Sequence, residues 1–286
     1  TTTDIPAARP LRSKRLNNTL VKGLALLEVL ARSDRPLGVT ELARRLEMGK
    51  SNVHRLLQAL TELRYVRRDE TAGTYQASIR VWELGAAMLG QLDLRQVAAP
   101  AMQGLLQRSR ETVHLSVLDQ DEVVYLHKLD SPEPVRAYSQ IGGRAPACCV
   151  ATGKAMLAFE SADLQQALSR RLVRHSPRSI VDAGEFLREM ERVRTQGYAV
   201  NRGEWRESVC GVAAPIRDPA GRVVAAIGVS GPAERLRPSL FKALGQDVIA
   251  AAAAVEHDYG GGSDSGMGVA ARVSAGAAPR SNLLHR

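Results

Sequence analysis

Early in the chain, leucine and valine recur every three or four positions, the spacing that brings side chains onto one face of a helix. Three such stripes follow one another, separated by polar or glycine-containing breaks. Their members are Leu20, Leu24, Leu27 and Leu30; Leu42 and Leu46; and Val53, Leu56, Leu57, Leu60 and Leu63. The pattern predicts three helices, with Thr40 and Ser51 as the N-terminal caps of the second and the third.

After the third stripe, the chain takes the pattern of two short strands. Residues 65–68 and 74–77 flank a polar turn at 69–73, which predicts a β-hairpin. Three helices followed by a two-stranded wing describe a winged helix-turn-helix domain. We place this domain at residues 16–78, with the helix-turn-helix itself at 39–58.

The rest of the chain predicts a second domain, reached through a helical linker at residues 79–93. Two hydrophobic hairpins are predicted at 113–129 and 212–229, and the turn of the second contains Pro and Gly. The helices expected around them lie near residues 94–110, 153–159, 162–170, 184–196 and 238–255. A sheet flanked by helices indicates an α+β domain over residues 94–257.

The two ends of the chain lack periodic patterns. Residues 1–15 are polar and basic, which predicts a flexible arm, and the Gly, Ala and Ser of residues 258–286 predict a disordered tail. No stretch approaches the roughly 18 apolar residues of a membrane span. The first residues also lack the apolar core of a signal peptide. We therefore expect a cytoplasmic protein that does not contact a membrane.

Positive charge is concentrated toward the N-terminal end. The 286 residues include 39 Lys and Arg and 30 Asp and Glu, and 44% of them are hydrophobic, enough for sizeable cores. Residues 1–82 alone hold 15 Lys and Arg against eight Asp and Glu. A small basic module of this kind is typical of a protein that binds a polyanion. Charge alone is equally compatible with a solvated basic surface.

The third predicted helix has a polar face opposite its apolar stripe. In a helix-turn-helix this helix enters the major groove, where Arg pairs with guanine and Asn or Gln pairs with adenine. Basic side chains at the helix start and in the wing suit the phosphate backbone or the minor groove. The candidate DNA-binding residues are Lys50, Ser51, Asn52, His54, Arg55, Gln58, Arg67 and Arg68. An ordinary solvated helix face is the alternative interpretation.

At this point the sequence resembles a known family in both domains. TELARRLEM, followed by KSNVHRLLQAL, YV and the wing, is similar to the N-terminal domain of the IclR family of bacterial transcription regulators. GRAPACCVATGKAMLAF, GYAVNRGEW and CGVAAPIRDPAGRVVAAIGVSGP resemble the family's effector domain. The resemblance covers about residues 16–257. It implies a helix-turn-helix domain joined to a GAF-like α/β effector-binding domain, working as a homodimer or a dimer of dimers on a roughly palindromic double-stranded DNA operator.

The resemblance also implies a pocket for a small carboxylic acid. Backbone N–H groups in the loop before the GKA sequence would hold the carboxylate, because the start of a helix carries the positive end of its dipole. The positions that the resemblance assigns to the effector are Ala151, Thr152, Asn201, Glu204, Gly211 and Ser230.

Two of these positions depart from the pattern of some members. Asn201 stands where some members have Asp, and Gly211 stands where some have Cys, with Cys210 one residue away. These differences indicate a ligand other than the one that those members bind. A pocket with fewer charges and an added Trp205 suits an aromatic acid. Trp205 and Cys149 either line the cavity or pack in the core.

No pattern predicts catalysis, a metal or a cofactor. Gly153-Lys154 lacks the earlier Gly and the following Ser or Thr of a phosphate loop. The three Cys lack zinc-site spacing, and no Gly-x-Ser-x-Gly sequence is present. We expect a ligand-responsive regulator of a catabolic operon. The alternatives are an enzyme or ligand-binding protein whose basic module assembles protein partners, and an architectural DNA-binding protein without a ligand.

Overall fold

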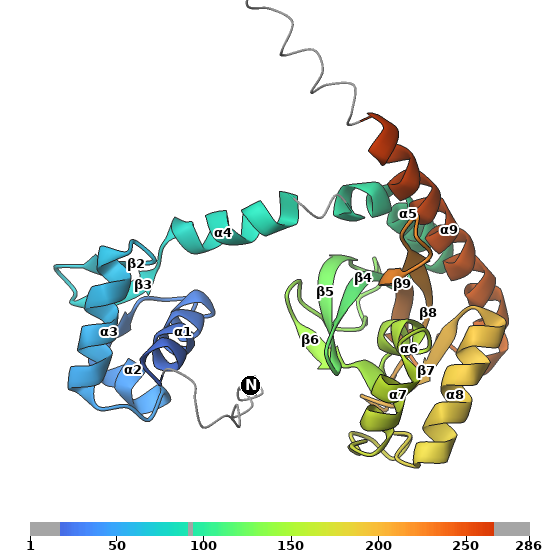
Figure 1. Cartoon of the computed structure of the whole chain (residues 1–286), viewed down its shortest axis with the longest axis horizontal. Helices are drawn as coiled ribbons and strands as arrows, with labels where there is room; N and C mark the ends of the chain where they lie inside the picture. Colours follow the sequence, from blue (N-terminus) through green and yellow to red (C-terminus); the bar gives the residue numbers. More distant parts are fainter. Residues whose placement is uncertain (1–17, 91–93, 266–286) are drawn as a thin grey trace, which may run out of the picture. The chain divides into compact units, whose positions relative to one another are not determined.

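The computed structural model describes residues 18–90 and 94–265, and for residues 86–90 and 261–265 it describes the backbone alone. The chain divides between Leu92 and Asp93 into two compact units, whose elements are labelled in Figure 1. The arm predicted at residues 1–15 lies outside the described residues.

Within residues 18–90, the first unit consists of helices around a small antiparallel sheet. Its helices are α1 (Asn18–Ala31), α2 (Val39–Arg45), α3 (Lys50–Glu62) and α4 (Ile79–Gly90). Its strands are β1 (Leu37–Gly38), β2 (Val66–Asp69) and β3 (Thr74–Ala77), in the order β1-β3-β2. This arrangement confirms the winged helix-turn-helix, with β2 and β3 as the wing and α4 following it directly.

The core of the first unit lies where α1, α2 and α3 meet. Leu30, Leu42, Val53 and Leu57 are buried there, as the stripes predict. Part of the first stripe is wrong, because Leu20 and Leu24 are 61% and 52% exposed while Leu26 is buried. Spacing identifies a helix face, but it does not say which turns of that face have a neighbour to pack against.

The predicted caps of α2 and α3 are also wrong, each by two residues. Gly38 and Gly49 are the N-cap residues, and no side chain caps either helix. Gly38 belongs to β1 and has an extended backbone conformation. Helix α2 therefore starts at Val39, and Thr40 lies inside its first turn. Ser51 likewise lies inside the first turn of α3, with its side chain exposed.

The second unit is a six-stranded antiparallel sheet with helices on both faces. Its strands are β4 (Thr112–Asp119), β5 (Glu122–Leu129), β6 (Arg144–Pro146), β7 (Ala199–Arg202), β8 (Val209–Arg217) and β9 (Val223–Pro232), in the order β6-β5-β4-β9-β8-β7. Its helices are α5 (Leu94–Ser109), α6 (Ala151–Leu157), α7 (Ala162–Ser169), α8 (Ala183–Gln196) and α9 (Phe241–Ser265). The two predicted hairpins are β4 with β5 and β8 with β9, and they are joined by the pairing of β4 with β9, in which Thr112 lies opposite Ser230.

Alternation along the strands produces two separate cores. Leu115, Val212 and Ile227 face α5 and α9, while Tyr125 and Ala213 face the layer of α6, α7 and α8. Figure 1 shows these two groups of helices on opposite sides of the sheet. The candidate site lies on the α6 side.

The structure adds strands β6 and β7 and lengthens the last helix. Both strands are short, with three and four residues, too short for alternation to distinguish them from loops. Helix α9 continues to Ser265, so residues 258–265 of the predicted tail are helical. A helix that has already formed extends through glycines at a cost of about 1 kcal/mol each. Residues 266–286 lie outside the described part of the chain.

Candidate functional site

The first candidate site is the outer face of α3. Val53, Leu56 and Leu57 turn inward. The helical period therefore turns the polar residues between them outward. Lys50, Ser51, His54, Arg55 and Gln58 are exposed, and Asn52 is half-buried. The structure thus brings all six α3 candidates onto a single accessible surface.

Two of these side chains already contact each other. The guanidinium of Arg55 donates to Oδ1 of Asn52 at 3.4 Å, a long bond that leaves most donors of Arg55 free. In the wing, Arg67 and Arg68 are exposed, and Arg68 lies 3.3 Å from Glu70. This ion pair is at the surface, where such pairs contribute little to stability. Arg68 could therefore leave Glu70 at little cost to contact a phosphate.

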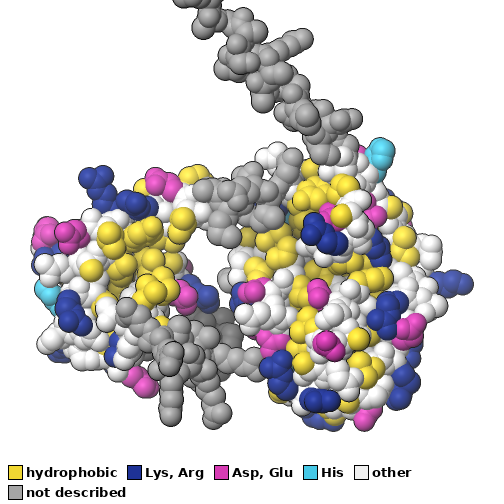
Figure 2. All heavy atoms as spheres, viewed as in Figure 1, with side chains coloured by type: hydrophobic (Ala, Val, Ile, Leu, Met, Phe, Trp, Pro, Cys, Tyr) yellow, Lys and Arg dark blue, Asp and Glu magenta, His cyan; other side chains and the backbone are white. Residues whose placement is uncertain are grey.

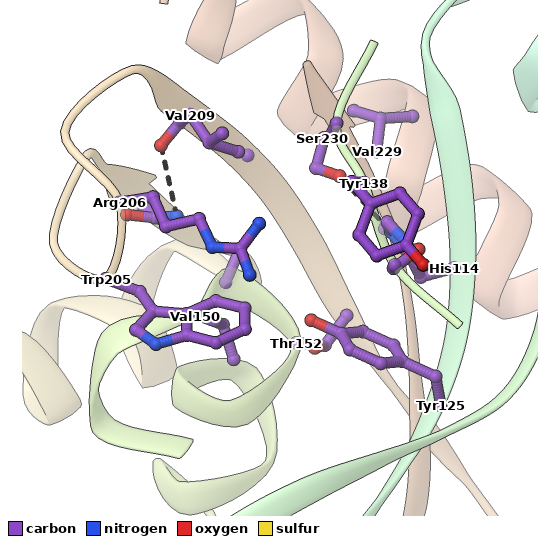
Figure 3. Close-up of a pocket in the computed structure, with 16 residues that line it drawn as sticks. His114, Tyr125, Tyr138, Val150, Thr152, Trp205, Arg206, Val209, Val229 and Ser230 are labelled. Atoms are coloured by element: carbon purple, nitrogen blue, oxygen red, sulfur yellow. Dashed lines mark hydrogen bonds between the residues drawn. The ribbon is translucent and has the colours of Figure 1, made fainter. Parts of the chain in front are cut away.

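The second candidate site is a cavity in the second unit, drawn in Figure 3. Its volume is about 50 Å³. At roughly 10–15 Å³ of free volume for each water that a cavity holds, it has room for about four waters, close to the size of one six-membered ring. It is lined by strands β4, β5, β7, β8 and β9, the start of α6, and the loops after β5 and β7.

Five of the six predicted effector positions line this cavity. They are Ala151, Thr152, Asn201, Gly211 and Ser230. Gly211 keeps the floor open, because a Cβ there would lie 2.9 Å from the carbonyl oxygen of Val229 and 3.7 Å from Cβ of Ala151. Behind α6, a Cβ at Gly153 would lie 2.2 Å from the carbonyl oxygen of Ala147, so only glycine allows this approach.

Glu204, the sixth position, is not among the residues that line the cavity. Its Oε1 accepts from Nζ of Lys154 at 2.7 Å, and the same ammonium group donates to Glu189 on α8 at 3.1 Å. Lys154 is completely buried, and both carboxylates are nearly so. Glu204 therefore belongs to a buried ion cluster that joins α6, α8 and the loop after β7, which corrects its assignment to the effector.

The two glutamates of this cluster have opposite pKa shifts. Burial would raise the pKa of Glu189, but the Lys154 charge and the charges of Arg192 and Arg202 together lower it. Burial raises the pKa of Glu204 despite Lys154. Its Oε2 is buried and has no hydrogen-bond partner among the described residues. The ammonium group lies closer to Glu204, at 2.7 Å, than to Glu189, at 3.1 Å.

At one end of the cavity, hydroxyl groups surround a neutral histidine. Nε2 of His114 lies 2.7 Å from Oγ of Ser139, and its Nδ1 lies 3.3 Å from Oγ of Ser230. Burial, helped by the charge of Lys128, lowers the pKa of His114 to about 4. The ring is therefore neutral at pH 7, donating through one nitrogen and accepting through the other.

The cavity also has aromatic walls and one charged side chain. The guanidinium carbon of Arg206 lies 4.6 Å from the ring centre of Trp205. Burial raises the pKa of Tyr125 to about 12, with Arg206 acting in the opposite direction, so the phenol keeps its proton. Tyr138, from the loop after β5, closes a further side (Figure 3).

Sequence reasoning missed several of these lining residues. His114 and Tyr125 carry a usable signal, because each interrupts a run of aliphatic residues on a predicted strand. Tyr138 and Arg206 lie on irregular loops, where no periodicity indicates which way a side chain points. Trp205, left open between cavity and core, does line the cavity.

Cys148 and Cys149 have the environment of residues that pack in a protein interior and not that of reactive nucleophiles. Burial raises the pKa of Cys148 to about 11 and that of Cys149 to about 12. Both remain protonated at pH 7 and therefore weakly reactive.

Within residues 18–90 and 94–265, no cluster of His, Cys, Asp and Glu has the arrangement of a metal site. Over the same residues, no helix combines the length and apolarity needed to cross a bilayer.

Comparisons with known proteins match both units. Residues 19–70 match the IclR helix-turn-helix domain, and residues 86–257 match the bacterial transcriptional regulator IclR C-terminal domain. The transcriptional regulator KdgR of Escherichia coli is 36% identical over 220 residues, covering 76% of this chain and 83% of KdgR. The transcriptional repressor AllR of Salmonella typhi is 32% identical over 229 residues, covering 79% of this chain and 84% of AllR.

Solved structures agree with these matches. An IclR homolog from Microbacterium hydrocarbonoxydans in complex with 4-hydroxybenzoate has a TM-score of 0.74 at 26% identity, covering 84% of this chain and 98% of its own. The IclR protein of Thermotoga maritima has a TM-score of 0.69 at 26% identity, covering 85% of this chain and 99% of its own.

Together these findings define the class of the protein as a DNA-binding transcription regulator and not an enzyme. Its first unit carries the DNA-binding helix-turn-helix domain of such regulators, and its second unit carries their C-terminal domain. The chain belongs to the IclR family.

Proposed function

We propose that this protein binds, as a homodimer or a dimer of dimers, a roughly palindromic duplex operator in the cytoplasm and controls a catabolic operon. A two-fold symmetric dimer presents its recognition helices as a related pair, and the half-sites of the operator must repeat that symmetry. The exposed polar face of α3 on a strongly basic unit supports this proposal.

Within this proposal, the side chains of α3 divide into two groups. Arg55, Asn52 and Gln58 have the chemistry to read guanine and adenine edges. His54 belongs to the same group of base-facing candidates. Lys50 and Ser51, at the start of the helix, suit phosphate oxygens. Arg67 and Arg68 in the wing contact the backbone or the minor groove.

The proposed effector is a small aromatic carboxylic acid. The single observation that carries this choice is a ring-sized cavity with aromatic side chains on its walls and one charged group among its described lining residues. The backbone N–H groups at Ala151 and Thr152 supply donors to a carboxylate there. The related Microbacterium structure contains 4-hydroxybenzoate, which supports the same ligand class.

A thermal-shift screen of the full chain tests the effector class. Benzoate and 4-hydroxybenzoate are compared with pyruvate and glyoxylate. A ligand at about 100 times its dissociation constant adds about 2.7 kcal/mol of stability. We expect a higher melting temperature with the aromatic acids. An increase with the aliphatic acids alone contradicts the aromatic assignment.

Selection from random duplexes, followed by salt titration, tests the DNA-binding part. We expect an enriched inverted repeat and a logarithm of affinity that falls linearly with the logarithm of salt concentration, because phosphate contacts release counterions. Salt-independent association, or selection of no motif, would favour a unit that assembles proteins.

A further inference from the structure

Arg206 is the one side chain with a permanent charge among the described residues that line the cavity. Its guanidinium reaches over the Trp205 ring and points into the cavity, as Figure 3 shows. It forms no ion pair with any carboxylate of the described chain. A guanidinium offers five N–H donors in a fixed plane and fits a carboxylate with two parallel hydrogen bonds.

Tyr125 enters the cavity from β5, with the centre of its ring 4.8 Å from that of the His114 ring. Figure 3 shows its hydroxyl directed toward the space between Arg206 and Thr152. The phenol is buried and keeps its proton at neutral pH, since its pKa is about 12. It therefore remains a hydrogen-bond donor next to a cation, which suits an anionic group of a ligand.

The turn that carries Arg206 is held from several sides. Oδ1 of Asn201 accepts from the backbone N–H groups of Gly203 and Glu204 at 2.9 and 2.8 Å. The hydroxyls of Ser176 and Ser179 donate to the carbonyl oxygen of Glu204 at 3.1 and 2.6 Å. With the side chain of Glu204 bound to Lys154, the turn is fixed before any ligand arrives, which lowers the cost of binding.

The far end of the cavity has no charge to offer. His114 is neutral and already lies between Ser139 and Ser230, so this end provides hydroxyls and an imidazole. A second carboxylate here would lose water without gaining a counter-ion, which is costly. A hydroxyl of a ligand, which donates and accepts, would fit this chain of hydrogen bonds.

We infer that Arg206, assisted by Tyr125, determines the specificity of the cavity for a carboxylate, and that Ser230 and His114 recognise a neutral hydroxyl at the opposite end of the same ligand. The inference rests on the proposed aromatic effector and deepens it. The ligand class it defines is a hydroxylated aromatic acid with a single negative charge, and Arg206 is the group that distinguishes the acid from its uncharged amide.

Isothermal titration calorimetry of the full chain with benzoate and benzamide tests the role of Arg206. These probes have nearly the same shape and differ in charge. Wild-type protein should bind benzoate at least tenfold more tightly, and Arg206→Gln should lose about 10- to 100-fold in benzoate affinity, the range of hydrogen bonds to charged groups. Its benzamide affinity should change little.

Two further variants control for folding and for general electrostatics. Arg206→Lys keeps the charge without the planar fork, so it should retain part of the preference for benzoate. Arg188→Gln removes another exposed charge, on α8, and should leave both affinities unchanged. Unchanged melting curves for the Arg206 variants confirm that the fold is intact, as the exposed position of Arg206 leads us to expect.

The hydroxyl end is tested with 4-hydroxybenzoate against benzoate. Wild-type protein should bind 4-hydroxybenzoate more tightly, and Ser230→Ala should abolish this difference. A preference for benzoate over benzamide that persists in Arg206→Gln, or a preference for the hydroxyl that persists in Ser230→Ala, overturns this inference alone. If wild-type protein binds none of the three probes, the proposed aromatic effector fails together with it.

Discussion

The candidate DNA-binding face of α3 and the ligand cavity are built in different ways. Lys50 to Gln58 lie on one continuous helix, and the helical period alone turns their side chains outward. The cavity collects side chains from five strands, one helix and two loops that are far apart in sequence. On a surface of the first kind, a single substitution affects the substituted side chain and leaves the rest of the fold intact. A cavity of the second kind depends on buried interactions that hold its elements together.

Figure 2 shows Lys and Arg side chains at the surface of both units, but the second unit also has a lysine in its interior. Lys and Arg side chains project from the first unit into solvent, where water screens them. In the second unit, Lys154 is buried among carboxylates, where one charge has a large effect. Substitutions in the two regions should therefore differ in effect, and the largest effect is expected at Lys154.

Lys154→Met should destabilise the second unit the most. Removing the ammonium group leaves Glu204 buried without its cationic partner, while Glu189 keeps Arg192, and breaking a buried pair from one side costs about 3–5 kcal/mol. Chemical denaturation of the full chain measures the loss. Lys242→Met, at an exposed position, is the matched control and should change stability by less than about 0.5 kcal/mol. Equal stability of the two variants would contradict the structural role of the cluster.

Arg55→Ala should impair recognition without affecting the fold. Arg55 is exposed and its contact with Asn52 is weak. The loss of a base contact should cost about 1–3 kcal/mol and relax sequence preference at one position of each half-site. Binding to the selected operator and to single-base variants measures this. Arg32→Ala removes an exposed charge elsewhere in the same unit. If Arg55→Ala retains full affinity and full sequence preference, Arg55 is not a reading residue.

Gly211→Ala should weaken effector binding and leave operator binding intact. The new Cβ would crowd the carbonyl oxygen of Val229 and approach Ala151 across the cavity floor. Overpacking costs about 1–3 kcal/mol, so the affinity for the aromatic acid should fall by at least about fivefold in calorimetry. Gly104→Ala adds the same methyl group on α5, where it meets only the end of the Arg108 side chain. An unchanged affinity in Gly211→Ala would place the effector elsewhere.

Arg67→Ala should have the smallest effect and one independent of sequence. A lost phosphate contact weakens binding to all duplexes alike and reduces the slope of log affinity against log salt by about one. Titrations of the operator and of an unrelated duplex at several salt concentrations measure both quantities. A loss confined to the operator would instead make Arg67 a base-reading residue.

The contrast between the two sites also explains what could be predicted from the sequence. Periodicity indicated which residues of α3 point outward, because a helix presents neighbours in sequence as neighbours in space. The resemblance placed Gly211 and Ser230 at the cavity. It also placed Glu204 there, since a carboxylate beside a pocket and a carboxylate beside a buried lysine have the same sequence signature. Only the three-dimensional structure brings Lys154 and Glu204 together across 50 residues.

Tyr138 and Arg206 illustrate a second limit. Both lie on irregular segments, and the turn that carries Arg206 is held in part by the distant Ser179. Local propensity carries no information about such turns. The exposed Leu20 and Leu24 illustrate the same limit on a regular helix, because burial depends on what packs against the helix.

The most direct test of this account measures whether the cavity controls the DNA-binding unit. Fluorescence anisotropy with the selected operator duplex gives the operator affinity of the full chain with and without saturating 4-hydroxybenzoate. Coupling between two sites typically amounts to about 1–3 kcal/mol. We therefore predict a change of about 5- to 150-fold in operator affinity for wild-type protein and a smaller change for Gly211→Ala at the same ligand concentration. Superimposable titrations of wild-type protein, with calorimetry showing the acid bound, would contradict the account.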